Sequence, residues 1–191
     1  MTLSSRVIFP LNQKWLYCPE HKPEHFLQGC DESGFVPVTL PHANIETPYC
    51  GFDDRIYQFV SSYRRHFRLP PELKGKRVFM DFDGAMTAAT IGINGKVLEE
   101  HRGGYVPFSF DLTDFIDWNG DNTLAVRLDC TERSDIPPFG GRIDYLTYGG
   151  IYREVRLRLV NPVFIESLFV KPKGIVKGDG RIEFLARIQN T

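Results

Sequence analysis

Apolar and polar residues alternate along much of this chain, a pattern typical of half-buried β-strands. Between residues 155 and 159, for example, Val155, Leu157 and Leu159 alternate with Arg156 and Arg158. The same reasoning predicts strands, in chain order, at residues 57–69, 77–82, 90–98, 105–110 and 123–128. No segment keeps apolar residues at helical spacing for three or more turns, so the chain is predicted to be mostly β.

Turn-forming residues connect these strands. The Asn94-Gly95 pair predicts a tight hairpin turn in the middle of residues 90–98. Residues 111–116 are predicted to form one helical turn with Asp111 as its cap. Residues 15–50 are rich in Pro and Gly and are predicted to form a long wrapping arm with few strands. Many short strands joined by long connections predict an all-β fold, a two-sheet β-sandwich of the jelly-roll kind.

The strand pattern restarts after the Asn161-Pro162 pair. Residues 164–170 and 181–188 are predicted to be two strands joined by a loop. Two strands cannot bury a core of their own. The chain is therefore predicted to hold one domain over residues 1–160 and an incomplete second domain over residues 161–191.

Charge and composition argue against several classes of function. The formal net charge of −1 predicts no binding to nucleic acid or to an anionic membrane. The densest basic run, residues 64–68, is interrupted by Phe67 and is predicted to be a solvated strand face. The N-terminus lacks a signal-peptide pattern, and no run approaches the roughly 20 apolar residues of a membrane span. The four cysteines have irregular spacing without a CxxC pair, so free thiols in a reducing cytoplasm are predicted.

Two segments resemble sites of known chemistry but lack the necessary context. Asp81 and Asp83 follow an apolar strand, as in phosphatases with an aspartate nucleophile, but a hairpin follows them where that chemistry needs a helix. They are predicted to be turn and edge residues. His21 and His25 have the spacing of a helical metal pair, but Pro23 between them favours loop histidines. No metal site and no cofactor is predicted.

The most informative segment is DYLTYGGIYREVRL, residues 144–157, in which a Gly-Gly break joins a β-strand. This segment resembles the signature of the N-terminal sugar-binding domain of glycoside hydrolase family 2, the β-galactosidases and β-glucuronidases. In that family an acidic residue precedes a Tyr-small-Gly-Ile-aromatic-Arg run. The matching positions here are Asp144, Tyr148, Gly149, Gly150, Ile151, Tyr152 and Arg153. The resemblance extends over residues 15–159 and includes the order of the predicted strands.

The resemblance implies a galactose-binding-like jelly roll, followed by the first strands of an immunoglobulin-like sandwich. In the family a TIM barrel comes next and carries both catalytic glutamates, so the resemblance implies no catalytic residue here. It implies a fragment of a retaining hydrolase of β-linked sugars, a β-galactosidase first and a β-glucuronidase next. Carbohydrate and the barrel domain are the implied partners, and a homo-oligomer is compatible with them. The alternative is a stand-alone carbohydrate-binding module.

The resemblance also implies two substrate-binding positions. Asp144 matches the acidic residue that reaches into the barrel's active site and binds sugar hydroxyls. The alternative for this residue is a turn cap or an ion pair with a neighbouring arginine. Gln58 falls near the family's second sugar-contacting position, counting back from Tyr63. Local packing explains Tyr148, Tyr152 and Arg153 at least as well as sugar contact, and Trp15 and Trp118 are predicted to lie in the core or at an interface.

Overall fold

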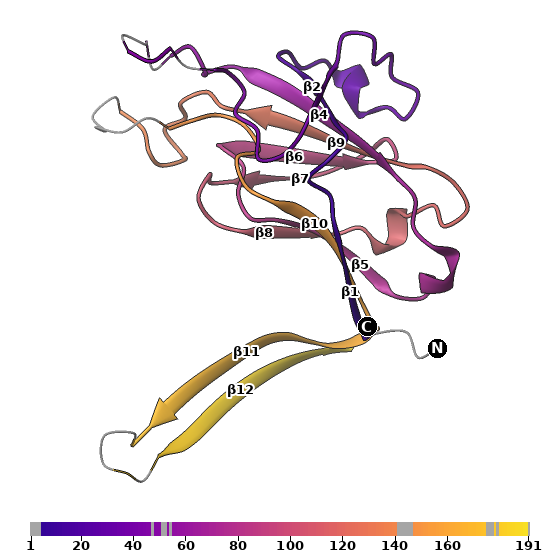
Figure 1. Ribbon diagram of the computed structural model, residues 1–191, viewed down its shortest axis with the longest axis vertical. Coiled ribbons are helices and arrows are strands. Elements are labelled where there is room, and N and C mark those ends of the chain that lie inside the picture. The colour runs from indigo at the N-terminus through magenta and orange to yellow at the C-terminus, as the bar shows by residue number, and fades with distance from the viewer. Residues whose placement is uncertain are drawn as a thin grey trace.

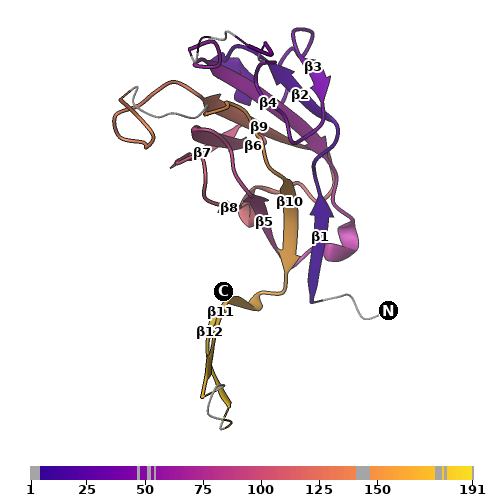
Figure 2. The same cartoon turned by 60° about the vertical axis from the view of Figure 1, so that its left-hand side comes forward.

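The structure is a computed structural model that describes residues 5–46, 48–50, 53, 55–140, 147–174, 178 and 180–190. Two antiparallel sheets face each other, and a separate β-hairpin projects from one end of the pair (Figures 1 and 2). Three short 3-10 turns are the helical elements of the described residues, η1 (Pro23–Phe26), η2 (Pro71–Leu73) and η3 (Thr113–Phe115). The predicted all-β sandwich is therefore confirmed.

The strands of each sheet come from distant parts of the chain. The larger sheet has the order β3-β2-β4-β9-β6-β7, with β3 (Val36–Val38), β2 (Trp15–Cys18), β4 (Val60–Phe67), β9 (Asn122–Asp129), β6 (Ala88–Ile93) and β7 (Lys96–Arg102). The smaller sheet has the order β1-β10-β5-β8, with β1 (Arg6–Pro10), β10 (Val155–Val160), β5 (Arg77–Phe82) and β8 (Phe108–Asp111). The chain passes from one sheet to the other several times, for example between β5 and β6, between β7 and β8 and between β9 and β10.

The core lies between the two sheets and follows the predicted alternation. In β10, Val155, Leu157 and Leu159 are buried and face the larger sheet, while Arg156 and Arg158 point outward. Trp15 is fully buried, and its indole N–H donates to the carbonyl oxygen of Leu11. Trp118 is partly buried against the same core. Both tryptophans therefore serve packing, as predicted.

The interpretation of residues 15–50 as an arm with few strands is partly wrong. This segment contributes β2 and β3 to the larger sheet, and β1, which precedes it, joins the smaller one. β2 is short and has no polar position that would reveal an alternation, because Trp15, Tyr17 and Cys18 are all buried and Leu16 is half-buried. Pairing with β4 stabilises it as a strand, a contact that local sequence cannot supply.

Two further expectations about charged residues are corrected. β5 lies between β10 and β8, so Asp81 is not on an edge strand; its carboxylate accepts hydrogen bonds from Arg158 at 2.7 and 3.0 Å. Asp83 binds Arg156 in the same way, at 2.7 and 2.9 Å. Residues 64–68 do not form a solvated face, because the Arg64 side chain is 0% exposed.

The two histidines of the 19–35 loop share one hydroxyl group. The Nδ1 atoms of His21 and His25 lie 2.9 and 2.8 Å from Ser62 Oγ of β4; His21 is a loop histidine, as predicted, whereas His25 belongs to the short 3-10 turn η1. Burial lowers the pKa of His21 to about 4 and also lowers the pKa of His25. Both folded pKa values lie below the value of about 6.5 in the unfolded chain. The unfolded state therefore binds more protons between pH 6.5 and 4, and stability falls as the pH decreases through this range.

The expected result is a lower urea midpoint at pH 5 than at pH 7.5. A His21→Gln variant should show a smaller difference between the two pH values, because one of the two titrating groups is removed. The measurement is the urea unfolding curve followed by circular dichroism. An unchanged pH difference in the variant would assign the effect to other groups.

The C-terminal hairpin consists of β11 (Val163–Lys173) and β12 (Arg181–Asn190), which pair only with each other among the described strands. The two predicted strands are therefore present, each slightly longer than expected. Cross-strand partners on one face are apolar: Ile165 with Ile188, Leu168 with Ala186, and Val170 with Phe184. Ala186 is half-buried and the other five are exposed by 49–72%, so this face of the hairpin is largely uncovered.

Candidate functional site

The loops at one end of the sandwich bring the sequence motif together with the Gln58 segment. These loops cover residues 55–59, 83–87, 103–107, 130–140 and 147–153, and they lie away from the β11–β12 hairpin (Figure 1). We call this region the loop end. It is built almost entirely from segments that connect one sheet with the other.

The two glycines of the motif let the chain pass between two neighbouring segments. On one side, the carbonyl oxygens of Gly149 and Ile151 accept the N–H groups of Asn44 and His42, at 3.0 and 2.9 Å. On the other side, Gly150 exchanges backbone hydrogen bonds with Met86, at 3.0 and 3.4 Å. Gly150 has a φ of +121°, and a Cβ atom there would overlap the His42 carbonyl oxygen. Only glycine fits this conformation and this space.

Replacing Gly150 with Ala is expected to reduce the free energy of unfolding by about 2–3 kcal/mol. The cost combines an unfavourable φ with a clash against backbone that cannot rotate away. Gly29→Ala is the matched control, because its added methyl group meets no atom within 4 Å. Urea unfolding of both variants gives the comparison. Equal stabilities would mean that the motif can shift without cost.

Asn44 joins the motif to the segment that carries Gln58. Its backbone N–H binds Gly149, and its side-chain Nδ2 donates to the carbonyl oxygen of Tyr57 at 2.8 Å. The hydroxyl of Tyr17 donates to the Asn44 carbonyl oxygen, also at 2.8 Å. Sequence reasoning missed Asn44, since it lies in the Pro-rich segment and over 100 residues from the motif. The only signal in the sequence is that Asn44 is a polar residue between two stretches of turn-forming residues.

Tyr152 and Arg153 are engaged within the chain. The Tyr152 hydroxyl donates to the Gly104 carbonyl oxygen at 2.5 Å. Arg153 Nη1 donates to the carbonyl oxygens of Asp83 and Tyr105, at 3.3 and 3.1 Å, and its guanidinium lies over the Tyr152 ring. These contacts favour the local packing interpretation for both residues. Ile151 is fully buried, whereas the Tyr148 side chain is half exposed and points its ring to the surface.

Asp144 lies outside the described residues, but both ends of its loop are placed. Before it, the Gly140 N–H donates to Glu132 Oε1 at 2.6 Å. After it, the Thr147 hydroxyl lies 2.6 Å from the Tyr57 hydroxyl. Both contacts border one small cavity of about 30 Å³. Phe139 and Thr147, on either side of residues 141–146, therefore both line this cavity.

Gln58 lines the same cavity. Its Oε1 accepts the backbone N–H of Glu132 at 3.3 Å, and its own N–H donates to the Arg55 carbonyl oxygen. The structure thus brings Gln58 together with both ends of the Asp144 loop, although these residues are more than 80 positions apart. The cavity itself has room for about one water molecule, so a sugar would have to bind at its mouth.

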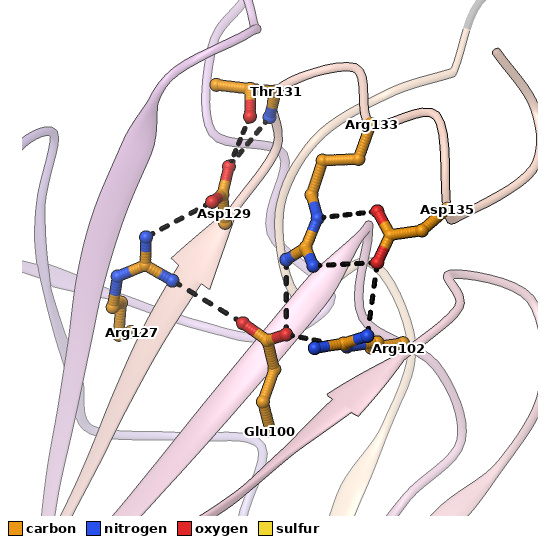
Figure 3. A network of polar contacts seen from close by, with 7 residues as sticks. All are labelled: Glu100, Arg102, Arg127, Asp129, Thr131, Arg133 and Asp135. Carbon is orange, nitrogen blue, oxygen red and sulfur yellow. Dashed lines mark hydrogen bonds and ion pairs between the residues drawn. The ribbon is translucent and has the colours of Figure 1, made fainter.

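A network of ion pairs holds the 130–140 loop in place (Figure 3). Glu100 of β7 binds Arg102 and Arg133, at 3.0 and 3.1 Å, and lies 3.8 Å from Arg127 of β9. Asp135 bridges the same two arginines, Arg102 and Arg133, at 3.1 and 2.9 Å. The loop that carries Glu132 is therefore fixed to two strands of the larger sheet. Sequence reasoning missed this network, because its members meet only once β7 and β9 share the sheet with β6.

Two aspartates of this network, Asp129 and Asp135, stay ionised at neutral pH. Hydrogen bonds from Thr131 and Arg127 outweigh the effect of burial and lower the pKa of Asp129. The ion pair with Arg133 lowers the pKa of Asp135. Such carboxylates are poor proton donors, because a general acid needs a raised pKa. They hold the loop in position.

Neither a metal ion nor a reactive thiol is indicated at the loop end. The described part of the chain has no cluster of three or more His, Cys, Asp or Glu side chains that could bind a metal. Burial raises the pKa of Cys130 to about 12, and its thiol donates to the Met86 carbonyl oxygen. All four cysteines are free, as predicted. Among the described residues, none of the helical elements is long and apolar enough to cross a membrane.

The fold and the loop end define a galactose-binding-like β-sandwich domain, in which loops between the sheets carry the candidate site. The chain belongs to the family described as glycosyl hydrolase 2 galactose-binding domain-like, whose model matches residues 28–136. This finding confirms the family indicated by the motif at residues 144–157.

Similar proteins are glycoside hydrolases. The chain is 42% identical to a β-galactosidase of Thermoanaerobacter pseudethanolicus, over 86% of this chain and 22% of that protein. It is 35% identical to a β-glucuronidase of Bacteroides fragilis, again over 86% and 22%. The crystal structure of a Bacteroides uniformis β-glucuronidase superposes with a TM-score of 0.79 at 32% identity, over 88% of this chain and 20% of that one. The chain thus spans about a quarter or less of the length of these relatives.

Proposed function

We propose that this chain is the non-catalytic sugar-binding domain of a retaining β-glycosidase, with a β-galactosidase first and a β-glucuronidase next. The observation that supports this proposal best is that Gln58 lines the same cavity as Phe139 and Thr147, the residues on either side of the Asp144 segment. The names of the relatives favour a β-linked galactoside or glucuronide as the substrate. The domain's task is to form one wall of the active site and to dock a catalytic barrel.

The chemistry of the loop end suits binding better than catalysis. Retaining hydrolysis needs two carboxyl groups about 5–5.5 Å apart, one of them with a raised pKa. The described carboxylates here are held by arginines or by backbone N–H groups, as in Asp135 and Glu132. An unpaired carboxylate on the Asp144 loop would instead accept two hydrogen bonds from neighbouring sugar hydroxyls. The rigid network around residues 130–140 would position that loop.

Activity measurements on the chain and on the full-length enzyme test this proposal. The purified 191-residue chain should hydrolyse neither p-nitrophenyl β-galactoside nor the β-glucuronide. In the full-length enzyme, Gln58→Ala should raise KM for the preferred substrate by roughly 3- to 20-fold, because one sugar hydrogen bond is lost. Gln28→Ala is the matched control, since Gln28 binds Asn94 at the β6–β7 turn. Turnover by the isolated chain would contradict the non-catalytic role.

Measurements of sugar binding distinguish this proposal from the alternative, a stand-alone carbohydrate-binding module. A stand-alone carbohydrate-binding module should bind lactose or a longer glycan as the isolated chain, with an affinity that a barrel does not improve. The domain of a glycosidase should bind a monosaccharide measurably only when the barrel completes the site. Calorimetric titration of both proteins with galactose distinguishes the two outcomes.

We also propose that residues 1–160 form one folding unit and that the hairpin belongs to a neighbouring sandwich, immunoglobulin-like in the related family. The support is the separate pairing of β11 with β12 and their exposed apolar face. Ending the chain after Val160 should change the melting temperature little and should reduce self-association, because an open apolar hairpin is removed. Ending it after Glu154, which deletes β10 from the smaller sheet, should prevent folding. A large loss of stability in the first truncation would place the hairpin in the core.

A further inference from the structure

A second hollow lies on the outer face of the smaller sheet, where the hairpin leaves the sandwich. β5, β8 and β10 form its floor, and the first residues of β11 with the last of β12 form its wall. Its volume is about 460 Å³, within the range of about 300–1,000 Å³ that is usual for small-molecule sites. We call it the hairpin cleft. Its lining residues Arg77 and Phe79 lie in the first half of β5, whereas the loop end begins after the last residue of that strand.

Two aromatic rings supply the apolar part of the cleft. Phe79 of β5 and Phe164 of β11 meet edge to face, with ring centroids 5.5 Å apart. The guanidinium of Arg158 lies 4.6 Å from the centroid of Phe79. Both rings are only partly buried. They offer an apolar surface next to planar polar groups, the combination that binds a ligand with one apolar and one polar side.

The hairpin wall carries hydrogen-bonding capacity that is only partly used. Gln189 Nε2 donates to Glu166 Oε2 at 3.1 Å. Within the described residues, Glu166 Oε1 and Gln189 Oε1 accept no hydrogen bond, and the amide of Gln189 keeps a second N–H. Arg158, which also lines the cleft, donates to Asp81 through Nε and Nη2 and to Ser109 through Nη2, and no bond of its Nη1 is present among the described residues.

The charges of the cleft disfavour an anionic ligand. Arg77 is paired with Asp111, and Arg158 is paired with Asp81 at 2.7 Å. Bonds from these arginines and from neighbouring hydroxyls outweigh burial and hold the pKa of both aspartates below the usual value, so both pairs stay ionised. Glu166 adds a negative charge, and Arg187, which is not among the lining residues, lies 3.7 Å from its Oε2. A phosphate or a sugar acid would meet no unpaired cation, whereas a neutral polyhydroxyl ligand would meet no charge penalty.

Another hollow, of about 220 Å³, lies farther along the same sheet. It is lined by Asp83, Phe108, Arg156 and Ser109, and Ser109 also lines the hairpin cleft. The two hollows follow β5 from Arg77 to Asp83, a length of about 20 Å at the usual rise of a strand. This length exceeds a single sugar ring, so an extended chain of rings fits the groove better than a monosaccharide does.

We propose that this groove on the outer face of the smaller sheet binds a neutral oligosaccharide, with the hairpin cleft as its main subsite. The hairpin cleft shares no lining residue with the loop end, and its ligand would be held by ring contacts with Phe79 and Phe164 and by hydrogen bonds to Glu166 and Gln189. The choice of a saccharide rests in part on the proposed function, because a glycosidase meets such chains as substrates. The groove would keep a glycan close to the enzyme between catalytic events.

Residue-resolved binding to the 191-residue chain tests this assignment. Amide NMR spectra recorded with lactose and with cellotetraose at tens of millimolar should show shifts at residues 164–166 and 189. Gln189→Ala and Glu166→Ala should each weaken the cellotetraose affinity by at least about tenfold, because each removes a hydrogen-bonding partner. Glu183→Gln is the matched control, since Glu183 lies farther out on the same hairpin and binds Lys173. Glucuronic acid should leave the cleft amides unshifted.

The result of this binding experiment does not depend on the proposal that Gln58 and Asp144 bind the substrate at the loop end. Gln58→Ala should leave the shifts at residues 164–166 unchanged, and failure of the glycosidase proposal would appear in the activity of the full-length enzyme instead. Circular dichroism of each variant confirms that the sandwich is intact. Absence of shifts at the cleft with both neutral probes, or equal affinity of Gln189→Ala and Glu183→Gln, would overturn the assignment.

Discussion

Replacing Arg64 with Met should lower the free energy of unfolding by about 3–5 kcal/mol. The Arg64 side chain is fully buried, yet it satisfies four acceptors of the 19–35 loop. Its guanidinium donates to the carbonyl oxygens of His25, Leu27 and Gln28, and its Nε binds the Glu32 carboxylate at 2.6 Å. Methionine fills a similar volume but removes the donors to all four acceptors. Among the described residues, the Leu27 carbonyl then keeps only the Cys30 N–H, and the partly buried Glu32 carboxylate keeps only its contact with His66.

Urea unfolding followed by circular dichroism measures this loss. Arg68→Met is the matched control, because Arg68 pairs with Asp121 at the surface and both side chains are more than half exposed. Exposed ion pairs contribute little, so the control should unfold at the wild-type urea concentration. Removing Glu32 as well should recover part of the loss, since the carboxylate that Arg64 neutralises is then absent. Equal stability of the Arg64 and Arg68 variants would show that the loop reorganises without cost.

Asp144→Asn in the full-length enzyme should lower kcat/KM by about 2–4 kcal/mol, or roughly 30- to 1,000-fold. Asparagine keeps the size of the side chain but loses its charge and one acceptor, so bound sugar hydroxyls are left poorly satisfied. Stability should barely change, because the residue is predicted to lie on a presenting loop outside the core. Steady-state kinetics and thermal unfolding of the same preparation measure the two effects.

A double-mutant cycle strengthens this test. A substrate that lacks one contacted hydroxyl should lose activity with the wild type and little more with the Asp144 variant. Asp114→Asn serves as the control, because Asp114 is an exposed residue of η3, far along the chain from the motif. A lower melting temperature with unchanged kcat/KM would identify Asp144 as a turn cap.

Local sequence determined the strands with a regular alternation and their turns. β5 spans Arg77–Phe82 as predicted, and the Asn94-Gly95 turn has the positive φ values, +51° and +82°, that this hairpin requires. Both signals act over a few residues: alternation fixes which side chains face the core, and the turn residues permit a backbone conformation that others resist. The turn predicted at residues 111–116 is present as η3, but the prediction of Asp111 as its cap is wrong, because the N-cap is Leu112; the Asp111 carboxylate accepts the N–H of Thr113, the first residue of η3.

Family membership was also readable from the sequence alone, because the motif at residues 144–157 combines several residue types in a fixed order. The resemblance also predicted Asp144 and Gln58 as sugar-contacting positions, and in the structure Gln58 lines the same cavity as Phe139 and Thr147, on either side of residues 141–146. The roles of these two residues in sugar binding stay predictions. No local pattern marks Asn44, because its importance comes from partners at positions 57 and 149.

Only the tertiary structure decided which strands are neighbours and which charged groups are buried. The sequence places Arg64 in a basic run, where an exposed face is the ordinary expectation for unpaired arginines. The fold buries it because four acceptors between residues 25 and 32 meet its guanidinium and compensate for the loss of water. The Glu100 network and the hairpin cleft arise in the same way, from residues that are distant in sequence. Burial of a charge depends on partners, and partners are set by the packing of the whole chain.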